Sequence, residues 1–123
     1  MPTTVSRKVV EPLPMVLDRV KGCCGPVAEP LPRRDADELA ALGKALADPT
    51  RVQMLHMLKH AVAPVCVCDF TAVFECGQPT VSHHLARLRE AGLVQSSKQA
   101  IWTIHQLCQD LSPAARAALE LIP

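Results

Sequence analysis

The chain has 123 residues, enough for one domain with its own core but small enough that a dimer interface would add to its stability. Its formal net charge is +1 with histidine neutral, so any contact with nucleic acid must come from a local basic face and not from a basic bulk. The N-terminus carries charge but no continuous apolar stretch behind it, and no apolar run has membrane-spanning length, so we expect a cytoplasmic protein with reduced thiols and no membrane partner.

The N-terminal segment, residues 1–33, is predicted to be an arm that precedes the folded domain. Six of the eleven prolines lie in residues 1–32, and this composition favours extended backbone with one short helix over residues 15–21. The arm carries Cys23 and Cys24, which stand between two glycines. Residues 34–123 are predicted to form the folded domain.

Two helices are predicted to follow the arm. Apolar residues recur at helical spacing over residues 35–46. Asp48 and Pro49 then mark the start of a second helix, because aspartate is a preferred N-cap and proline fits the first helical position. The apolar stripe of this second helix consists of Val52, Leu55 and Leu58.

A helix-turn-helix is predicted next, because two helical patterns are joined by a short segment that contains glycine. Residues 68–74 read as a short helix, Gly77 is expected to make the turn, and a longer helix over residues 78–90 stops at Gly92. The residues of the short helix that are expected to face inward are Phe70, Val73 and Phe74.

A hairpin that would form a wing is predicted after the helix-turn-helix. Apolar and polar residues alternate over residues 93–96 and 101–105, on either side of an expected turn at residues 97–99. The sequence therefore predicts a fold that is mostly α with a small β-hairpin, a winged helix-turn-helix.

Residues 111–122 close the chain, and Ser112 and Pro113 mark the start of the last predicted helix. Its alanine and leucine side chains suit close packing against a partner. We expect this helix and the helix over residues 35–46 to form the interface of a homodimer.

The helix over residues 78–90 has two unlike faces. Steps of about 100° per residue place Val81, Leu85 and Leu88 on one side and hydrogen-bonding side chains on the other. Side chains of this kind contact phosphates and base edges when a recognition helix enters the major groove, although an ordinary solvated face is equally polar. The candidate DNA-binding residues on this helix are Gln78, Thr80, Ser82, His83 and Arg87.

Four of the six cysteines occur in two close pairs, Cys23 with Cys24 and Cys66 with Cys68. Adjacent cysteines close only a small disulfide ring, whereas stabilising bridges close longer loops. Thiolates select soft or borderline ions such as Cu(I), Zn(II) and Cd(II), and As(III) and Sb(III) bind three sulfurs by the same argument. The alternative is a buried apolar role, which we favour for the isolated Cys76 and Cys108.

Cys66 and Cys68 can bind one ion together only if Cys66 precedes the helix. In a helix, positions i and i+2 diverge by about 200°, whereas in extended chain they lie on one side. A helix that starts near Cys68, after Pro64, permits this arrangement and lowers the pKa of a thiol at its N-terminus. One or both arm cysteines would then have to reach the pair.

Three stretches of the chain resemble the ArsR/SmtB family of winged-helix metalloregulatory repressors. They are residues 45–51 (ALADPTR), 66–70 (CVCDF) and 78–94 (QPTVSHHLARLREAGLV), and the resemblance covers residues 35–122. It implies a homodimer, not an enzyme, that binds double-stranded operator DNA when it is metal-free and leaves the DNA when metal binds. It also implies that Cys66 and Cys68 are inducer ligands, as in the arsenite-responsive and cadmium/lead-responsive branches.

The chain departs from this family in three places. Thr71 stands where arsenite repressors with the motif of residues 66–70 often have a third cysteine. The absence of that cysteine here favours recruitment of Cys23 and Cys24. The C-terminal helix has no histidine, so it lacks the zinc site that some members build there. The wing lacks the usual glycine and arginines and retains Lys98 as its basic candidate for DNA contact.

We therefore predict a repressor of a metal or metalloid resistance operon that senses As(III), with Sb(III) as a second inducer, through Cys23, Cys24, Cys66 and Cys68. Two alternatives keep the same fold: a sensor of Cd(II), Pb(II) or Zn(II), and a repressor whose thiols respond to oxidants or persulfides. A thiol oxidoreductase usually has Cys-x-x-Cys in a βαβ setting, and the sequence shows neither.

Overall fold

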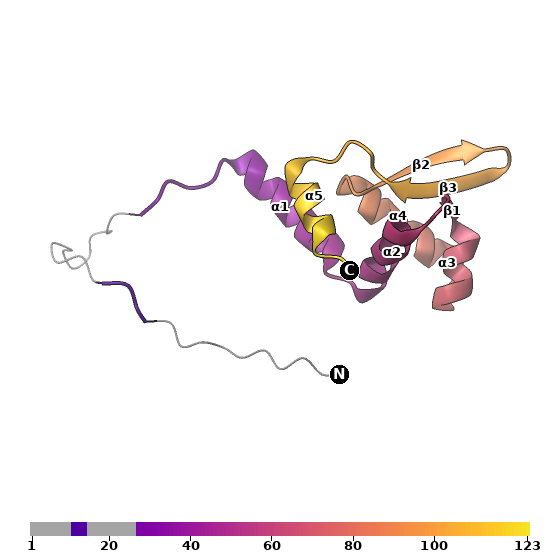
Figure 1. Ribbon diagram of the computed structural model, residues 1–123, viewed down its shortest axis with the longest axis horizontal. Helices are drawn as coiled ribbons and strands as arrows, with labels where there is room; N and C mark the ends of the chain where they lie inside the picture. Colours follow the sequence, from indigo (N-terminus) through magenta and orange to yellow (C-terminus); the bar gives the residue numbers. More distant parts are fainter. Residues whose placement is uncertain (1–10, 15–26) are drawn as a thin grey trace. The chain divides into compact units, whose positions relative to one another are not determined.

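A computed structural model of the chain describes residues 11–14 and 27–123 (Figure 1). The folded unit comprises Leu31–Pro123. Residues 11–14 and 27–32 are exposed and have no regular secondary structure. The predicted helix over residues 15–21 and the two arm cysteines, Cys23 and Cys24, lie outside the described residues.

The folded unit contains five helices and a small antiparallel sheet, as the sequence predicts for a winged helix-turn-helix. The elements are α1 (Arg33–Leu46), α2 (Pro49–His60), β1 (Val65–Cys66), α3 (Val67–Phe74), α4 (Gln78–Glu90), β2 (Val94–Gln99), β3 (Trp102–Leu107) and α5 (Pro113–Glu120). The sheet has the order β1-β3-β2, and α5 packs beside α1 (Figure 1). The sheet extends away from the helices on the side where α3 lies.

Two helices begin where the sequence predicts. The carboxylate of Asp48 accepts hydrogen bonds from the backbone N–H groups of Thr50 and Arg51, at 2.8 and 3.2 Å. Burial alone would raise the pKa of Asp48, but these two hydrogen bonds, together with the charges of His84 and Arg51, lower the pKa below its ordinary value. Ser112 caps α5 in the same way, because its hydroxyl accepts from the backbone N–H of Ala115 at 3.1 Å.

The core lies between the helices and the sheet. Its fully buried large side chains are Phe70, Met54, Leu55, Leu85, Leu88, Leu93 and Val81. Burial of one such side chain contributes about 1.5–3 kcal/mol. The inward position of Phe70 agrees with the prediction, whereas Val73 is 58% exposed and its predicted burial is wrong. Val67, Phe70 and Phe74 share one face of α3, and Val73 lies about 90° from the middle of that face.

The turn between α3 and α4 is made by a different residue from the one predicted. Glu75 adopts the left-handed conformation at φ 51°, whereas Gly77 is the extended N-cap of α4 at φ −70°. Gly92 ends α4 with φ 76°, in agreement with its predicted role as a stop signal.

The hairpin turn also lies further along the chain than expected. The strands run to Gln99 and resume at Trp102, so the turn is at Ala100 and Ile101, and Lys98 is a strand residue paired with Thr103. Polarity misled the prediction because the tip of the hairpin is exposed on both faces, and an exposed strand is as polar as a turn. Strand β1 was not predicted, since two residues carry no alternation and their partner is distant in the sequence.

Candidate DNA interface and thiolate site

Helix α4 presents a polar face to solvent. Its other face is fully buried through Val81, Leu85 and Leu88, and α3 packs against it to complete the helix-turn-helix. A proline in the first turn suits the helix start, where no intrahelical donor is required. The structure places all five helix residues predicted to contact DNA on the exposed surface: Gln78, Thr80, Ser82, His83 and Arg87.

Arg87 forms an exposed ion pair on this surface. Its Nη1 lies 3.0 Å from Glu90 Oε2, and the two side chains are 52% and 65% exposed. Exposed pairs of this kind contribute about 0–1 kcal/mol, so the guanidinium can exchange Glu90 for another anion at low cost. Lys98 is exposed on β2, in the wing and not on the helix.

The structure meets the geometric condition for convergence of Cys66 and Cys68. Cys66 ends β1 with extended backbone, at φ −94° and ψ 165°, and is the N-cap residue of α3. Cys68 lies in the first turn of that helix and is exposed. The backbone N–H of Cys66 donates to Asp69 Oδ2 at 3.0 Å, which fixes the entry of the chain into the helix.

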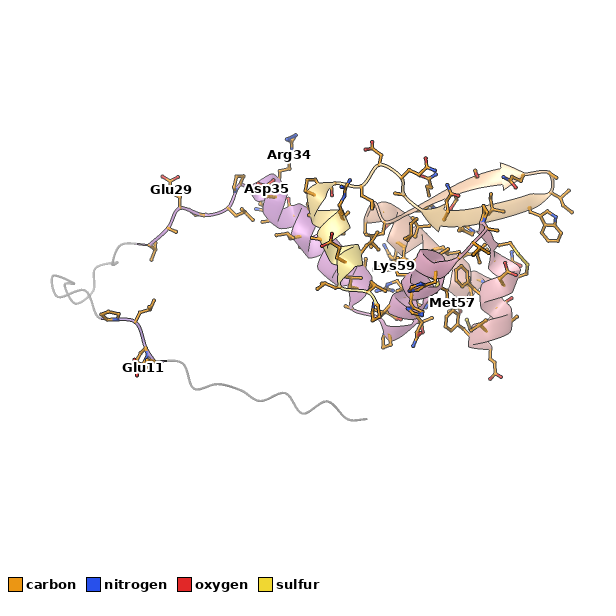
Figure 2. All side chains as sticks on the ribbon, in the orientation of Figure 1. Glu11, Glu29, Arg34, Asp35, Met57 and Lys59 are labelled. Atoms are coloured by element: carbon orange, nitrogen blue, oxygen red, sulfur yellow. A yellow bond between two sulfur atoms is a disulfide. The ribbon has the colours of Figure 1, made fainter. Side chains whose placement is uncertain are left out.

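The two sulfur atoms of this pair are joined in a disulfide, whereas the sequence predicts free thiols (Figure 2). The bond is possible because the extended backbone of Cys66 brings its side chain to the same side as that of Cys68. Reduction gives two neighbouring thiols at a helix N-terminus, the position that favours thiolates.

Within the described residues, no third cysteine belongs to the cluster around Cys66 and Cys68. The ligand atoms of Cys66, Cys68 and Asp69 all lie within 4.8 Å of one another. Thr71 Oγ1 donates to the carbonyl of Cys68 at 3.0 Å, so this hydroxyl is engaged by its own helix. Burial, and then the Asp110 carboxylate, raise the pKa of Cys108, which disfavours its thiolate.

The cysteine pair adjoins the wing. An open pocket of about 320 Å³ is lined by Pro64, Cys66, Cys68, Asp69, Gln99, Trp102 and Ile104. Strand β1 pairs with β3 so that Cys66 faces Ile104, and α3 packs against α4. The pair therefore lies where the first strand of the sheet meets the helix behind α4.

Comparison with known proteins agrees with this arrangement. The profile of the family described as "Bacterial regulatory protein, arsR family" matches residues 48–96. The arsenical resistance operon repressor of Staphylococcus xylosus is 32% identical over 85 residues, which cover 69% of this chain and 80% of that protein. The chain belongs to the arsR family. Members of this family are DNA-binding transcriptional regulators.

Two further relatives of this arsR-family protein match over a shorter region. The arsenical resistance operon repressor of Escherichia coli is 41% identical over 66 residues, or 54% of this chain and 56% of that protein. The cadmium resistance regulatory protein of Listeria innocua is 34% identical over 64 residues, or 52% of this chain and 53% of that protein. The chain thus spans little more than half the length of these two proteins.

Solved structures show the same architecture. HlyU of Vibrio cholerae is 31% identical with a TM-score of 0.60, over 72% of this chain and 91% of that one. A homodimeric winged helix-turn-helix domain from Mycobacterium bovis, described as a possible ArsR-family regulator, is 25% identical with a TM-score of 0.61, over 77% and 86% of the two chains. These likenesses confirm the predicted winged helix-turn-helix fold.

The structure also reveals a connection in this arsR-family protein that the sequence did not suggest. Arg89 Nη1, on α4, donates to Ser96 Oγ at 3.2 Å, and that hydroxyl lies 2.7 Å from Nδ1 of the buried His105. Burial, and then the Arg89 guanidinium, lower the pKa of His105, so both disfavour its protonated form. Ser96 and His105 are opposite each other in the pairing of β2 with β3, and this position would have predicted their hydrogen bond. The sequence could not use it because the strand register was unknown.

None of the helices in the described part of the chain is both long enough and apolar enough to cross a bilayer.

Proposed function

We propose that this protein is a homodimeric transcriptional repressor that binds operator DNA when its thiols are empty and reduced, and that As(III) releases it from DNA. Cys66 and Cys68 supply two of the three sulfurs, and Cys23 or Cys24 of the arm supplies the third. Gln78, Thr80, Ser82, His83 and Arg87 contact the operator from α4, and Lys98 contacts it from the wing. Sb(III) acts as a second inducer.

The observation that carries this proposal is the position of the cysteine pair. Both sulfurs lie on the same side of the chain at the start of α3, which packs directly against α4. An ion that binds them ties the end of β1 to the first turn of α3, so it shifts or stiffens the helix behind the reading face. A coupling free energy of about 1–3 kcal/mol between the two sites is typical of such switches.

The choice of As(III) rests on ligand chemistry and on the relatives. The pair offers soft sulfur, and Asp69 is the one carboxylate in its cluster within the described residues. Repressors of arsenical resistance operons from two bacteria are relatives of this chain, although a cadmium resistance regulator is a relative too. A sensor of Cd(II), Pb(II) or Zn(II) is therefore the competing assignment within the same fold.

The homodimer is supported by apolar surface on the elements that the sequence assigns to the interface. Leu39 on α1 is 54% exposed and Leu121, just after α5, is 76% exposed. The two helices pack side by side (Figure 1). A second copy that covers these side chains would relate the two α4 helices by a two-fold axis, as a palindromic operator requires.

Operator binding by the reduced full-length protein tests this proposal. Fluorescence anisotropy with a fragment of its own promoter should show tighter binding than random DNA of equal length, and As(III) should reverse it at lower concentration than Zn(II) or Cd(II). Cys66→Ser/Cys68→Ser should bind DNA normally and resist As(III), whereas Cys108→Ser should respond like the parent. A release order with Zn(II) or Cd(II) well ahead of As(III) would assign the site to the competing metals.

A second function is favoured by the disulfide itself. Oxidation of the reduced Cys66 and Cys68 thiols to a disulfide passes two electrons to an oxidant and releases two protons. The same pair could therefore switch α3 without any ion. Treatment with peroxide or a persulfide donor in the absence of metal should then release DNA, and a thiol reductant should restore binding. Retention of DNA by the oxidised protein would eliminate this function.

A further inference from the structure

A second set of metal-binding side chains, which is not part of the cysteine cluster, lies at the end of α2. His56 Nδ1 lies 2.8 Å from the main-chain oxygen of Pro123, and His60 Nε2 lies 3.0 Å from the same oxygen. The two imidazole rings are 4.7 Å apart between centroids and are tilted by 55°. Two imidazole nitrogens, one from each ring, therefore lie within hydrogen-bond distance of the same oxygen, and all three atoms are potential metal ligands.

The spacing of the two histidines suits a shared ion. Residues four apart on a helix are neighbours on one face, and this spacing is the one that helical zinc sites use. The adjacent His83 and His84 on α4 differ in this respect, since their ring centroids lie 6.3 Å apart. His56 and His60 are both exposed, so an ion can enter without displacing core side chains.

The C-terminal segment is held in place by α2 itself. Lys59, which is labelled in Figure 2, donates from Nζ to the carbonyls of Leu119 and Ile122, at 3.0 and 2.6 Å. These bonds keep the Pro123 oxygen beside the two rings. The Lys59 ammonium is also a positive charge close to the cluster, and it weakens the binding of any cation there.

We propose that His56, His60 and the main-chain oxygen of Pro123 form a site for a borderline divalent cation such as Zn(II) or Ni(II). Imidazole nitrogen with a single oxygen is a donor set for these ions and not for As(III), which selects sulfur. The Pro123 oxygen can only accept, so each ring now carries its hydrogen on the nitrogen that faces it. When the metal binds, the facing nitrogen of each ring gives up its hydrogen to water, and the other ring nitrogen takes one up from water, so each ring stays a neutral imidazole.

The site links two parts of the chain that lie far apart in the sequence. A bound ion replaces two hydrogen bonds by coordination and fastens the residues after α5 to the end of α2. In the unfolded chain the two histidines are separated from Pro123, so the ion binds the folded state more tightly. It therefore raises the melting temperature in a concentration-dependent way. This effect is independent of the cysteines.

The test uses the full chain with Cys23, Cys24, Cys66 and Cys68 replaced by serine, titrated with Zn(II) by calorimetry and by NMR of the imidazole signals. We expect one Zn(II) per chain and selective shifts of the His56 and His60 signals. His56→Gln/His60→Gln in the same background should lower the affinity by more than about tenfold, a loss that even outer partners of a metal ligand cause. His83→Gln should bind Zn(II) like the parent.

Two results would overturn the site. One is equal Zn(II) affinity in the His56→Gln/His60→Gln variant, and the other is a set of Zn(II)-induced shifts that spares His56 and His60. The NMR measurement needs no substitution at the histidines, so it decides the matter even if the double variant folds poorly. Neither result bears on release of DNA by As(III), which requires the cysteines.

Discussion

Cys66 lies directly opposite Ile104 in the antiparallel pair of β1 and β3. The proposed inducer ligand is therefore part of the same sheet as the wing, and the next residue begins the helix that packs against α4. An ion or a disulfide at this point would therefore act on both elements that we propose to contact DNA. This relationship gives the switch a physical route that the helix-turn-helix pattern alone does not contain.

The first prediction uses Trp102, the single tryptophan of the chain, as a reporter of the cysteine pair. Trp102 lines the same pocket as Cys66 and Cys68 and is 55% exposed. Addition of As(III) to the reduced protein should change its emission with one saturable phase, because the ion alters the polarity and packing of that pocket. Cys66→Ser/Cys68→Ser should show no such phase. An unchanged titration in that variant would place the ion elsewhere.

The second prediction concerns the arm. Cys66 and Cys68 supply two sulfurs, and Thr71 carries a hydroxyl where a third cysteine could stand. As(III) therefore needs a third sulfur from another part of the chain. Cys23→Ser/Cys24→Ser should leave operator binding by the empty protein intact and should abolish or greatly weaken release by As(III). Cys76→Ser, a free cysteine in the folded unit, is the control and should respond like the parent. If As(III) releases the Cys23→Ser/Cys24→Ser variant from DNA as it releases the parent, the arm does not supply a ligand.

The third prediction concerns Arg87. Loss of its exposed pair with Glu90 costs little stability, so Arg87→Ala should act mainly on DNA binding. We expect about tenfold weaker operator binding, equivalent to about 1.4 kcal/mol, and a salt slope reduced by about one if the partner is a phosphate. Arg33→Ala is the matched control, because Arg33 forms a similar exposed pair with Asp37 on α1. Equal losses in both variants would argue against a role for α4.

The fourth prediction concerns Ser96. Its hydroxyl is the partner of the buried His105 Nδ1, and His105 Nε2 has no partner within the described part of the chain. Ser96→Ala should therefore lower the free energy of unfolding by about 1–3 kcal/mol, measured with urea. Ser97→Ala, at the exposed neighbouring position, should change it by less than about 0.5 kcal/mol. Equal effects would mean that the hydrogen bond to His105 contributes nothing.

The fifth prediction is a pH dependence that originates at His105. Burial and Arg89 lower its pKa from the ordinary value of 6.5, so the folded state binds this proton less readily than the unfolded state. The stability from this residue is therefore present above the unfolded pKa and is lost as the pH falls below it. Urea unfolding at about pH 7.5 and about pH 5.5 should show a decrease in the parent that is smaller in His105→Gln. An identical decrease would assign it to the other histidines.

Much of the fold follows from local sequence patterns. Asp48 and Ser112 mark helix starts, Gly92 marks a helix end, and the apolar spacing in α4 separates its buried face from its polar face. These features depend on backbone conformation and on burial within one element, so neighbours in the sequence carry the information. The convergence of Cys66 and Cys68 belongs to the same class, because it requires an extended residue before a helix start.

Other features depend on contacts between distant residues. The pairing of β1 with β3, the shifted turn at Ala100, and the chain from Arg89 through Ser96 to His105 all require the strand register. Polarity cannot supply that register where both faces of the hairpin are exposed. In the same way, the exposure of Val73 follows from where α4 lies against α3.

The sequence by itself therefore determined the helices of the folded unit, their caps, the polar face of α4 and the candidate soft ligands, because propensity and periodicity are local. The tertiary structure alone decided that the cysteine pair borders the wing and that His56 and His60 meet Pro123. In each case the partners are separated by tens of residues, and only packing of the helices and pairing of the strands brings them within contact distance.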